Sequence, residues 1–161
     1  MTTLGYGGTF VAFTYLTPIL QEVTGLREST VSLILLLYGI AIRNLIGGKL
    51  ANKNPLRALL WMFILQTIVL LIFTFTAPNP ILSIITLFIM GALSFSNVPG
   101  LQFLVVQIAE KELLGTEDVA SAVNIAVCNV GIAIGAYVGG LVVSSYLGVE
   151  ATPWVGAIFV L

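Results

Sequence analysis

The chain has 161 residues, of which 58% are hydrophobic and only 8% are charged, and its formal net charge is −1. Soluble domains carry about 25% charged residues, so this composition excludes both a water-soluble globule and a disordered chain. The net charge of −1 leaves no basic surface for binding nucleic acid. With one cysteine (Cys128) and no histidine, the sequence also excludes a disulfide scaffold and a zinc site. The composition predicts an all-α integral membrane protein whose first partner is the lipid bilayer, with no cofactor and no metal.

Five apolar segments are long enough to cross the membrane, which takes roughly 20 residues for about 30 Å of hydrocarbon. They cover about residues 4–20, 30–50, 56–77, 81–109 and 119–147. A sixth begins at Pro153 and covers 153–161, which at about 1.5 Å per residue is under half a crossing. The fourth segment is longer than a crossing needs and contains Pro99, which favours a kinked or tilted helix.

Basic residues between the segments are distributed asymmetrically. Lys49, Lys53 and Arg57 precede or open the third segment, and Lys111 lies between the fourth and the fifth. The connections on the opposite side carry only Arg27. The positive-inside rule therefore places the basic loop with Lys49, Lys53 and Arg57 in the cytoplasm. We expect a multi-pass protein of a bacterial inner membrane.

Three stretches of the sequence resemble the major facilitator superfamily. Residues 47–57 (GGKLANKNPLR) resemble its basic signature between paired helices, although Asn52 stands where an aspartate is usual. Residues 131–140 (GIAIGAYVGG) resemble the glycine stripe of proton-coupled efflux members, with Ala136 in place of proline. Residues 151–157 (ATPWVGA), with 120–124 (ASAVN) upstream, resemble the sugar- and drug-efflux branch that includes arabinose-efflux-like permeases and purine efflux pumps.

The resemblance covers essentially the whole chain and implies one domain, residues 1–161, which is the C-terminal six-helix half of that fold with a truncated last helix. It implies secondary active transport: proton-coupled efflux of sugars, drugs or similar small solutes by alternating access. The expected partner is an N-terminal six-helix half, and we expect the 161 residues alone not to catalyse proton-coupled transport. Three alternatives stay open: an inactive truncated fragment, a small non-transporting membrane subunit, and a half-size transporter that pairs with another chain.

Arg43 is the one charge in the interior of a predicted span, since Lys49 and Arg57 lie at span ends. A buried arginine is costly in the bilayer, so it is a candidate for substrate binding or coupling. Gly39 and Gly47 lie four residues to either side, on the same helix face, which indicates packing against another helix. The alternative is a snorkelling side chain that reaches the cytoplasmic surface from about six residues away.

Glycines also mark one face of the fifth span. Gly131, Gly135 and Gly139, with Gly140 beside them, form a stripe that predicts close packing against a neighbouring helix and a sliding surface for conformational change. Gly48 in the basic loop is a further glycine of the motif. Val142, on the same span, is expected to face lipid.

Polar side chains within the spans are further candidates for substrate contact. Gln102 lies near Asn97 and Pro99 in the fourth span, and Asn124 and Asn129 lie on different faces of the fifth. Each buried amide needs a hydrogen-bond partner, which is either a substrate or another helix. Tyr15 in the first span lines a cavity or packs against a neighbour.

The acidic residues are all predicted to lie outside the spans: Glu22, Glu28, Glu110, Glu112, Glu117, Asp118 and Glu150. Because proton coupling usually requires a protonatable group at depth, a proton carrier is expected in the other half. The absence of a phosphate-binding loop motif excludes an ATP-driven pump for this chain.

Overall fold

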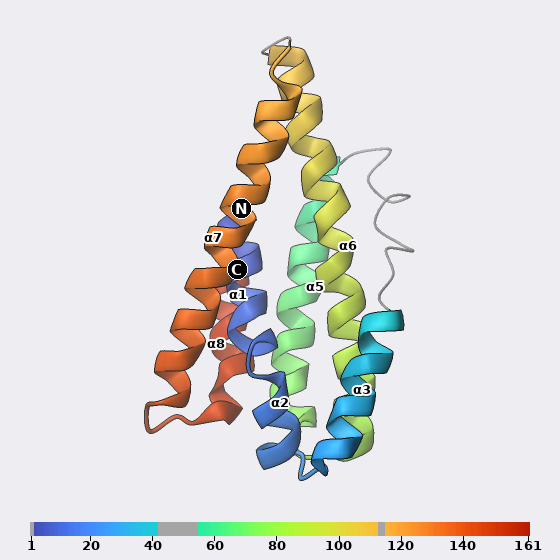
Figure 1. The fold of residues 1–161 in the computed structure, drawn as a ribbon, viewed down its shortest axis with the longest axis vertical. Helices are drawn as coiled ribbons and strands as arrows, with labels where there is room; N and C mark the ends of the chain where they lie inside the picture. Colours follow the sequence, from blue (N-terminus) through green and yellow to red (C-terminus); the bar gives the residue numbers. More distant parts are fainter. Residues whose placement is uncertain (1, 42–54, 113–114) are drawn as a thin grey trace.

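The computed structural model describes residues 2–41, 55–112 and 115–161. Within these ranges every regular element is a helix, and the helices run roughly along one axis as an elongated bundle (Figure 1). The predicted all-α class is confirmed.

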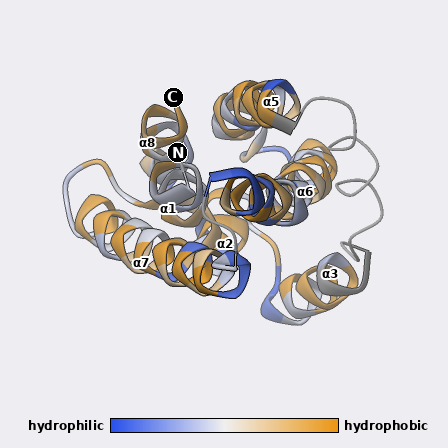
Figure 2. Ribbon diagram, turned by 90° about the horizontal axis from the view of Figure 1, so that it is seen from above, coloured by the Kyte–Doolittle hydropathy of each residue, from blue (hydrophilic) through white to orange (hydrophobic). Residues whose placement is uncertain are grey.

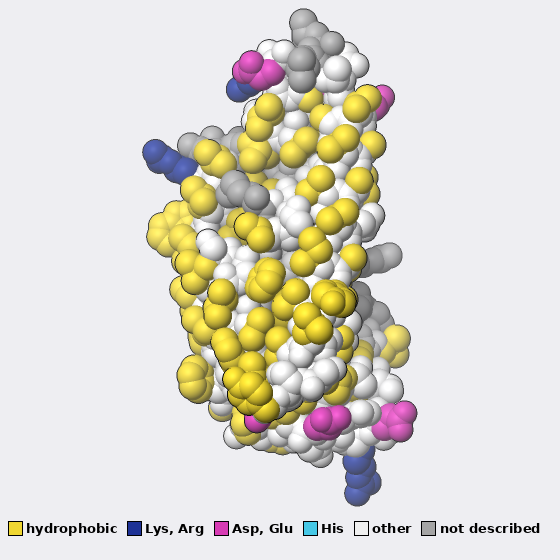
Figure 3. Space-filling view, turned by 90° about the vertical axis from the view of Figure 1, so that its left-hand side faces the viewer, with side chains coloured by type: hydrophobic (Ala, Val, Ile, Leu, Met, Phe, Trp, Pro, Cys, Tyr) yellow, Lys and Arg dark blue, Asp and Glu magenta, His cyan; other side chains and the backbone are white. Residues whose placement is uncertain are grey.

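The helices follow the chain in this order: α1 (Thr2–Phe13), α2 (Leu16–Pro18), a π-helical turn (Ile19–Val23), α3 (Glu28–Ala41), α5 (Pro55–Thr76), α6 (Pro80–Glu112), α7 (Glu117–Val143), a 3-10 turn (Val149–Ala151) and α8 (Thr152–Val160). Among the described residues, α5, α6 and α7 are long and apolar enough to span a membrane. Hydrophobic side chains cover the middle of the molecule and charged ones gather toward its ends (Figure 3). This distribution matches a bilayer with water on both sides.

The first predicted span, 4–20, is not one continuous helix. α1 ends at Phe13, and the N–H of Tyr15 donates to the carbonyl of Ala12 at 3.1 Å, three residues back instead of four. Pro18 has no N–H to donate to the carbonyl of Thr14, which favours a break here. Helical structure resumes at Leu16 and passes into the π-helical turn.

The other helices differ from the predicted spans mainly at their ends. α6 continues through Pro99 without interruption, and α7 ends at Val143, four residues before the predicted end at 147. α3 is described to Ala41, so Arg43, Gly47, Gly48, Lys49 and Lys53 lie outside the described residues.

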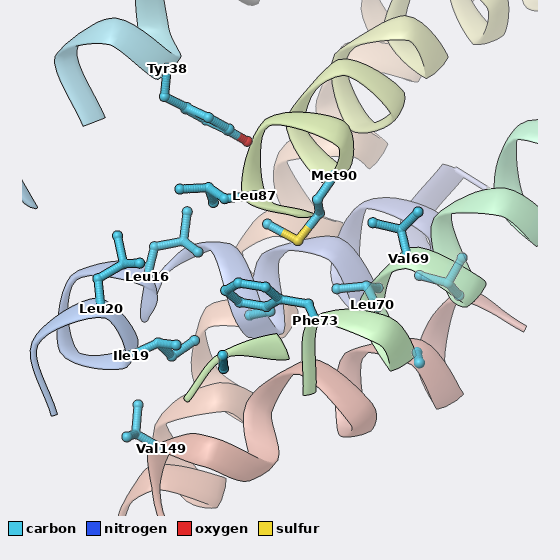
Figure 4. Close-up of a cluster of buried hydrophobic side chains, with 14 of the residues drawn as sticks. Leu16, Ile19, Leu20, Tyr38, Val69, Leu70, Phe73, Leu87, Met90 and Val149 are labelled. Atoms are coloured by element: carbon cyan, nitrogen blue, oxygen red, sulfur yellow. The ribbon is translucent and has the colours of Figure 1, made fainter. Parts of the chain in front are cut away.

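The bundle consists of two groups of neighbouring helices, which contact each other through α5 and α8 and through α6 and α7. Seen from above, α1 lies between α7 and α8, whereas α6 lies between α5 and α3 (Figure 2). Phe73 of α5, Met90 and Leu87 of α6, and Leu16 and Ile19 of the first segment form a buried cluster where the two groups meet (Figure 4). Since lipid is as apolar as these side chains, moving them out of lipid gains little free energy. Their close packing against one another is therefore what stabilises the bundle.

Several connections lie at the same end of the bundle. Residues 24–27, 77–79 and 144–148 are at its lower end, and the facing ends of α6 and α7 are at its upper end (Figure 1). The hydroxyl of Thr24 donates to the carbonyl of Ala77 at 2.7 Å, so two of the lower connections are joined directly. Gly25 and Gly148 have φ of +74° and +70°, a conformation that glycine adopts without strain and that reverses the chain here.

The predicted membrane orientation leads to a labelling experiment. In a Cys128→Ala background, we expect Tyr146→Cys to react with an impermeant maleimide from outside the cell and Lys111→Cys to react only after the membrane is opened. Both residues are exposed and lie at opposite ends of the bundle, and the basic residues favour the Lys111 side as cytoplasmic. Reaction of Lys111→Cys in intact cells would contradict the orientation. The Cys128→Ala protein without a new cysteine is the control.

Candidate functional site

The glycine stripe of α7 lies directly against α1. A Cβ added at Gly131 would lie 2.6 Å from the carbonyl oxygen of Thr3, and one added at Gly139 would lie 2.8 Å from that of Val11. Between these two points, a Cβ at Gly135 would overlap the carbonyl oxygen of Gly7. We call this line of backbone contact the glycine seam. Because contacts advance together along both chains, α1 and α7 run parallel.

A second glycine contact joins α1 to α8. A Cβ at Gly8 would lie 2.5 Å from the carbonyl oxygen of Gly156, and a Cβ at Gly156 would overlap the carbonyl oxygen of Gly8. The adjacent residues Gly7 and Gly8 therefore face different helices. α1 is held between α7 and α8 with its backbone close to both.

At the upper end of the glycine seam, four polar side chains form a hydrogen-bonded chain that we call the amide network. The hydroxyl of Thr2 donates to the amide oxygen of Asn124 at 3.3 Å, and the amide nitrogen of Asn124 donates to Gln102 at 2.9 Å. The amide nitrogen of Gln102 donates in turn to the hydroxyl of Ser121. The network links α1, α6 and α7, and it satisfies both ends of two amides inside an apolar bundle.

A cavity of 130 Å³ lies between α1, α5, α6 and α7. Its walls include the rings of Phe10, Phe13, Phe63 and Phe95, together with the amide of Asn97. The side chain of Asn97 is only 3% exposed. Among the residues described, its amide oxygen has no hydrogen-bond partner.

Deeper in the bundle, Gln66 of α5 is fully buried and donates to the hydroxyl of Ser94 at 2.9 Å. Ser94 lines the cavity as well, and its own hydroxyl donates to the carbonyl of Met90. Within the described ranges, the amide oxygen of Gln66 is unpaired. The interior of the bundle is thus polar at Gln66, Ser94 and Asn97, on the side of α6 that faces α5 and α1.

The remaining candidates from the sequence fall at separate places. Tyr15 is half-buried and its hydroxyl donates to the carbonyl of Ala136 at 3.1 Å, next to Gly140, so it joins the first segment to α7. Asn129 is exposed on α7, about 120° around the helix from Gly135 at the centre of the glycine seam. Pro99 is half-buried within α6, and Arg57 is exposed at the start of α5. Gly39 lies in α3.

Some residues of these sites escaped the sequence analysis. Thr2, Ser121 and Gln66 were not singled out, although Gln66 interrupts an otherwise apolar span and a lone amide there is a usable signal. Gly5, Gly7 and Gly8 cluster in α1 and face α5, α7 and α8 respectively, which is a second usable signal. By contrast, nothing local identifies Thr2 as the partner of a residue 122 positions away.

Sequence comparison gives the family. The sequence model of the Major Facilitator Superfamily matches residues 1–161. The chain belongs to the major facilitator superfamily. No solved structure matches it.

Curated relatives in this superfamily are bacterial transport proteins. The chain is 56% identical over 162 residues to the uncharacterized MFS-type transporter YtbD of Bacillus subtilis, covering 99% of the chain and 41% of that protein. It is 36% identical over 159 residues to the inner membrane transport protein YdhP of Escherichia coli, covering 98% of the chain and 40% of YdhP. It is 33% identical to the putative transporter AraJ of Escherichia coli, covering 89% of the chain and 36% of AraJ.

The chain therefore spans about two fifths of the length of these major facilitator relatives. The superfamily is one of transporters and not of enzymes. Together with the apolar helices, it makes the protein a multi-pass membrane protein of bacterial type.

Proposed function

We propose that residues 1–161 form the C-terminal six-helix half of a secondary active transporter that exports small solutes by alternating access. The observation that carries the proposal is the placement of polar side chains inside a bundle of membrane helices. The amide network and the pair of Gln66 and Ser94 lie between helices, where an unneeded polar group would be costly. Superfamily membership supports transport as the use of such an interior.

Proton coupling is the second part of the proposal. Every acidic residue lies at a helix end or in a connecting turn. A proton carrier at membrane depth then belongs to the N-terminal half that we propose as the partner. Arg43 is proposed to pair, through its positive charge, either with an anionic group of the solute or with a carboxylate that carries the proton in the N-terminal half.

Transport assays test the proposal directly. Everted vesicles containing the protein at its native length are energised with lactate, and the proton gradient is followed by quenching of an acridine dye. We expect addition of a transported solute to dissipate part of the gradient, and uncoupler to abolish solute uptake. Arabinose and chloramphenicol are the first sugar and drug to test. The 161 residues alone are expected to give no response, and co-expression with the N-terminal half to restore it.

Arg43 supplies the specific variant. Arg43→Ala is expected to remove solute-driven proton movement at equal membrane abundance, and Arg43→Lys to retain part of it, since the charge is kept. Full activity of Arg43→Ala would favour the snorkelling alternative. Uncoupler-sensitive uptake by the 161 residues alone, with no partner copurifying, would replace the proposal by a self-assembling half-size transporter.

A further inference from the structure

We propose that the surface between α5 and α8 binds one phospholipid with a primary ammonium headgroup, phosphatidylethanolamine, from the leaflet at the lower end of the bundle. Such a lipid site is separate from the proposed transport function and does not depend on it. Three features support it: a hollow with a carboxylate at the lower end of the two helices, an apolar groove above the hollow, and the alignment of both along the same pair of helices.

The hollow lies at the level of lipid headgroups. It is open, measures 290 Å³, and is formed where the lower ends of α5 and α8 meet the connecting turns. Its walls include Thr74 of α5, Glu150 of the 3-10 turn and Trp154 of α8. Trp154 is half-buried, and tryptophan is enriched where headgroups meet the hydrocarbon of a bilayer. A headgroup of the lower leaflet therefore reaches this hollow.

The polar groups of the hollow favour an ammonium ion. Glu150 supplies a carboxylate, and none of the side chains that line the hollow among the described residues is a Lys or Arg. The hydroxyl of Thr74 donates to the carbonyl of Leu70 at 3.2 Å, which leaves the lone pairs of its oxygen to accept. A primary ammonium offers three N–H donors to such oxygens, whereas a trimethylammonium group offers none. The carboxylate also repels a headgroup of net negative charge.

An apolar groove continues the hollow toward the membrane centre. Leu71 and Ile68 of α5 and Val160 of α8 line it, and both α5 residues are exposed. α5 and α8 contact each other and run in opposite directions (Figure 1). Leu71 precedes Thr74 by three residues on α5, and Val160 follows Trp154 by six on α8. At about 1.5 Å per residue, the groove thus begins roughly 5 to 9 Å above the hollow on both helices.

One molecule of membrane lipid matches this arrangement, with its headgroup in the hollow and an acyl chain in the groove. The groove follows α5 from Leu71 to Leu60, which is about 16 Å of helix. One leaflet contributes about 15 Å of hydrocarbon, so an acyl chain that enters beside Leu71 extends along most of the groove. A soluble organic cation would satisfy the hollow and leave the groove without an occupant.

Native mass spectrometry of the protein at its native length tests the site. The protein is given equal amounts of phosphatidylethanolamine, phosphatidylcholine and phosphatidylglycerol with the same acyl chains, and the retained lipids are counted. We expect phosphatidylethanolamine in about threefold excess over phosphatidylcholine, the size of effect that an exposed ion pair gives, and phosphatidylglycerol least. Glu150→Gln is expected to abolish the excess, and Glu150→Lys to make phosphatidylglycerol the favoured lipid. Both variants should fold, since Glu150 is exposed.

Glu28→Gln is the matched control, because Glu28 is an exposed acid at the same end of the bundle that lines neither the hollow nor the groove. It should keep the threefold excess. Glycerophosphoethanolamine, the same headgroup without acyl chains, should not displace the lipid at equal concentration; displacement would mean a site for soluble ammonium compounds and would overturn the inference. Equal retention of the three lipids by the unaltered protein, or an excess that survives Glu150→Gln, would overturn it as well.

Discussion

Replacing Gly135 by leucine is expected to destabilise the protein strongly and to lower its folding yield. A Cβ at this position already overlaps the carbonyl oxygen of Gly7, a backbone atom that cannot rotate away. A leucine side chain therefore forces α1 and α7 apart along the whole glycine seam. Overpacking a well-packed interior costs about 1–3 kcal/mol, and here the loss of neighbouring backbone contacts adds to it. We expect a low yield of monodisperse protein in detergent and a large fall in its melting temperature.

Val130→Leu is the matched control for Gly135→Leu, since Val130 lies on the same helix and its side chain is 54% exposed. It should fold with the same yield as the unaltered protein. Val142, which the sequence suggested as a lipid-facing position, is only 9% exposed and would be a poor control; that expectation was wrong. Equal yields of Gly135→Leu and Val130→Leu would show that the glycine seam is not a packing contact.

Replacing Asn124 by leucine is expected to destabilise the contact between α1, α6 and α7. The substitution removes the partner of Thr2 and leaves the amide oxygen of Gln102 without a donor in the bundle. An orphaned buried polar group costs about 1–3 kcal/mol, and the half-buried Gln102 is expected at the lower end of this range. The measured result should be a lower melting temperature in nanodiscs and faster amide hydrogen exchange at the upper ends of the three helices.

Asn129→Leu is the control for this variant, because it is the same substitution on the same helix at an exposed position. It is expected to leave the melting temperature unchanged. The double variant Asn124→Leu with Gln102→Leu should recover part of the stability lost in Asn124→Leu, since it removes the orphaned amide as well. Additive losses would mean that the two amides do not act together.

The sequence predicted membrane helices and the glycine face of α7, because both depend on local patterns: long apolar runs and small residues four apart. It did not identify α1 as the partner of that face. α1 carries its own signal in Gly5, Gly7 and Gly8, but pairing two distant faces requires knowledge of the topology. The sequence also did not predict the break in the first span, since this break depends on Pro18 together with a hydrogen bond from Tyr15 to distant α7.

The polar residues of α6 also divide into what the sequence could predict and what it could not. The sequence grouped Asn97 with Gln102, yet five positions along a helix turn the side chain by about 140°. The structure accordingly assigns Asn97 to the cavity and Gln102 to the amide network. Their distribution over two places follows from helix geometry, whereas the identity of each partner follows only from the arrangement of the bundle.

The position of α1 between α7 and α8 also has a consequence for synthesis. Tyr15 and its partner Ala136 are separated by 121 residues, so a ribosome working at about 5–20 residues per second needs roughly 6–24 s to make the second after the first. Throughout that interval the two glycine faces of α1 are in the bilayer without the helices they pack against. Any insertase or chaperone that shields them then acts on α1, which reaches its packed position only when α7 and α8 arrive.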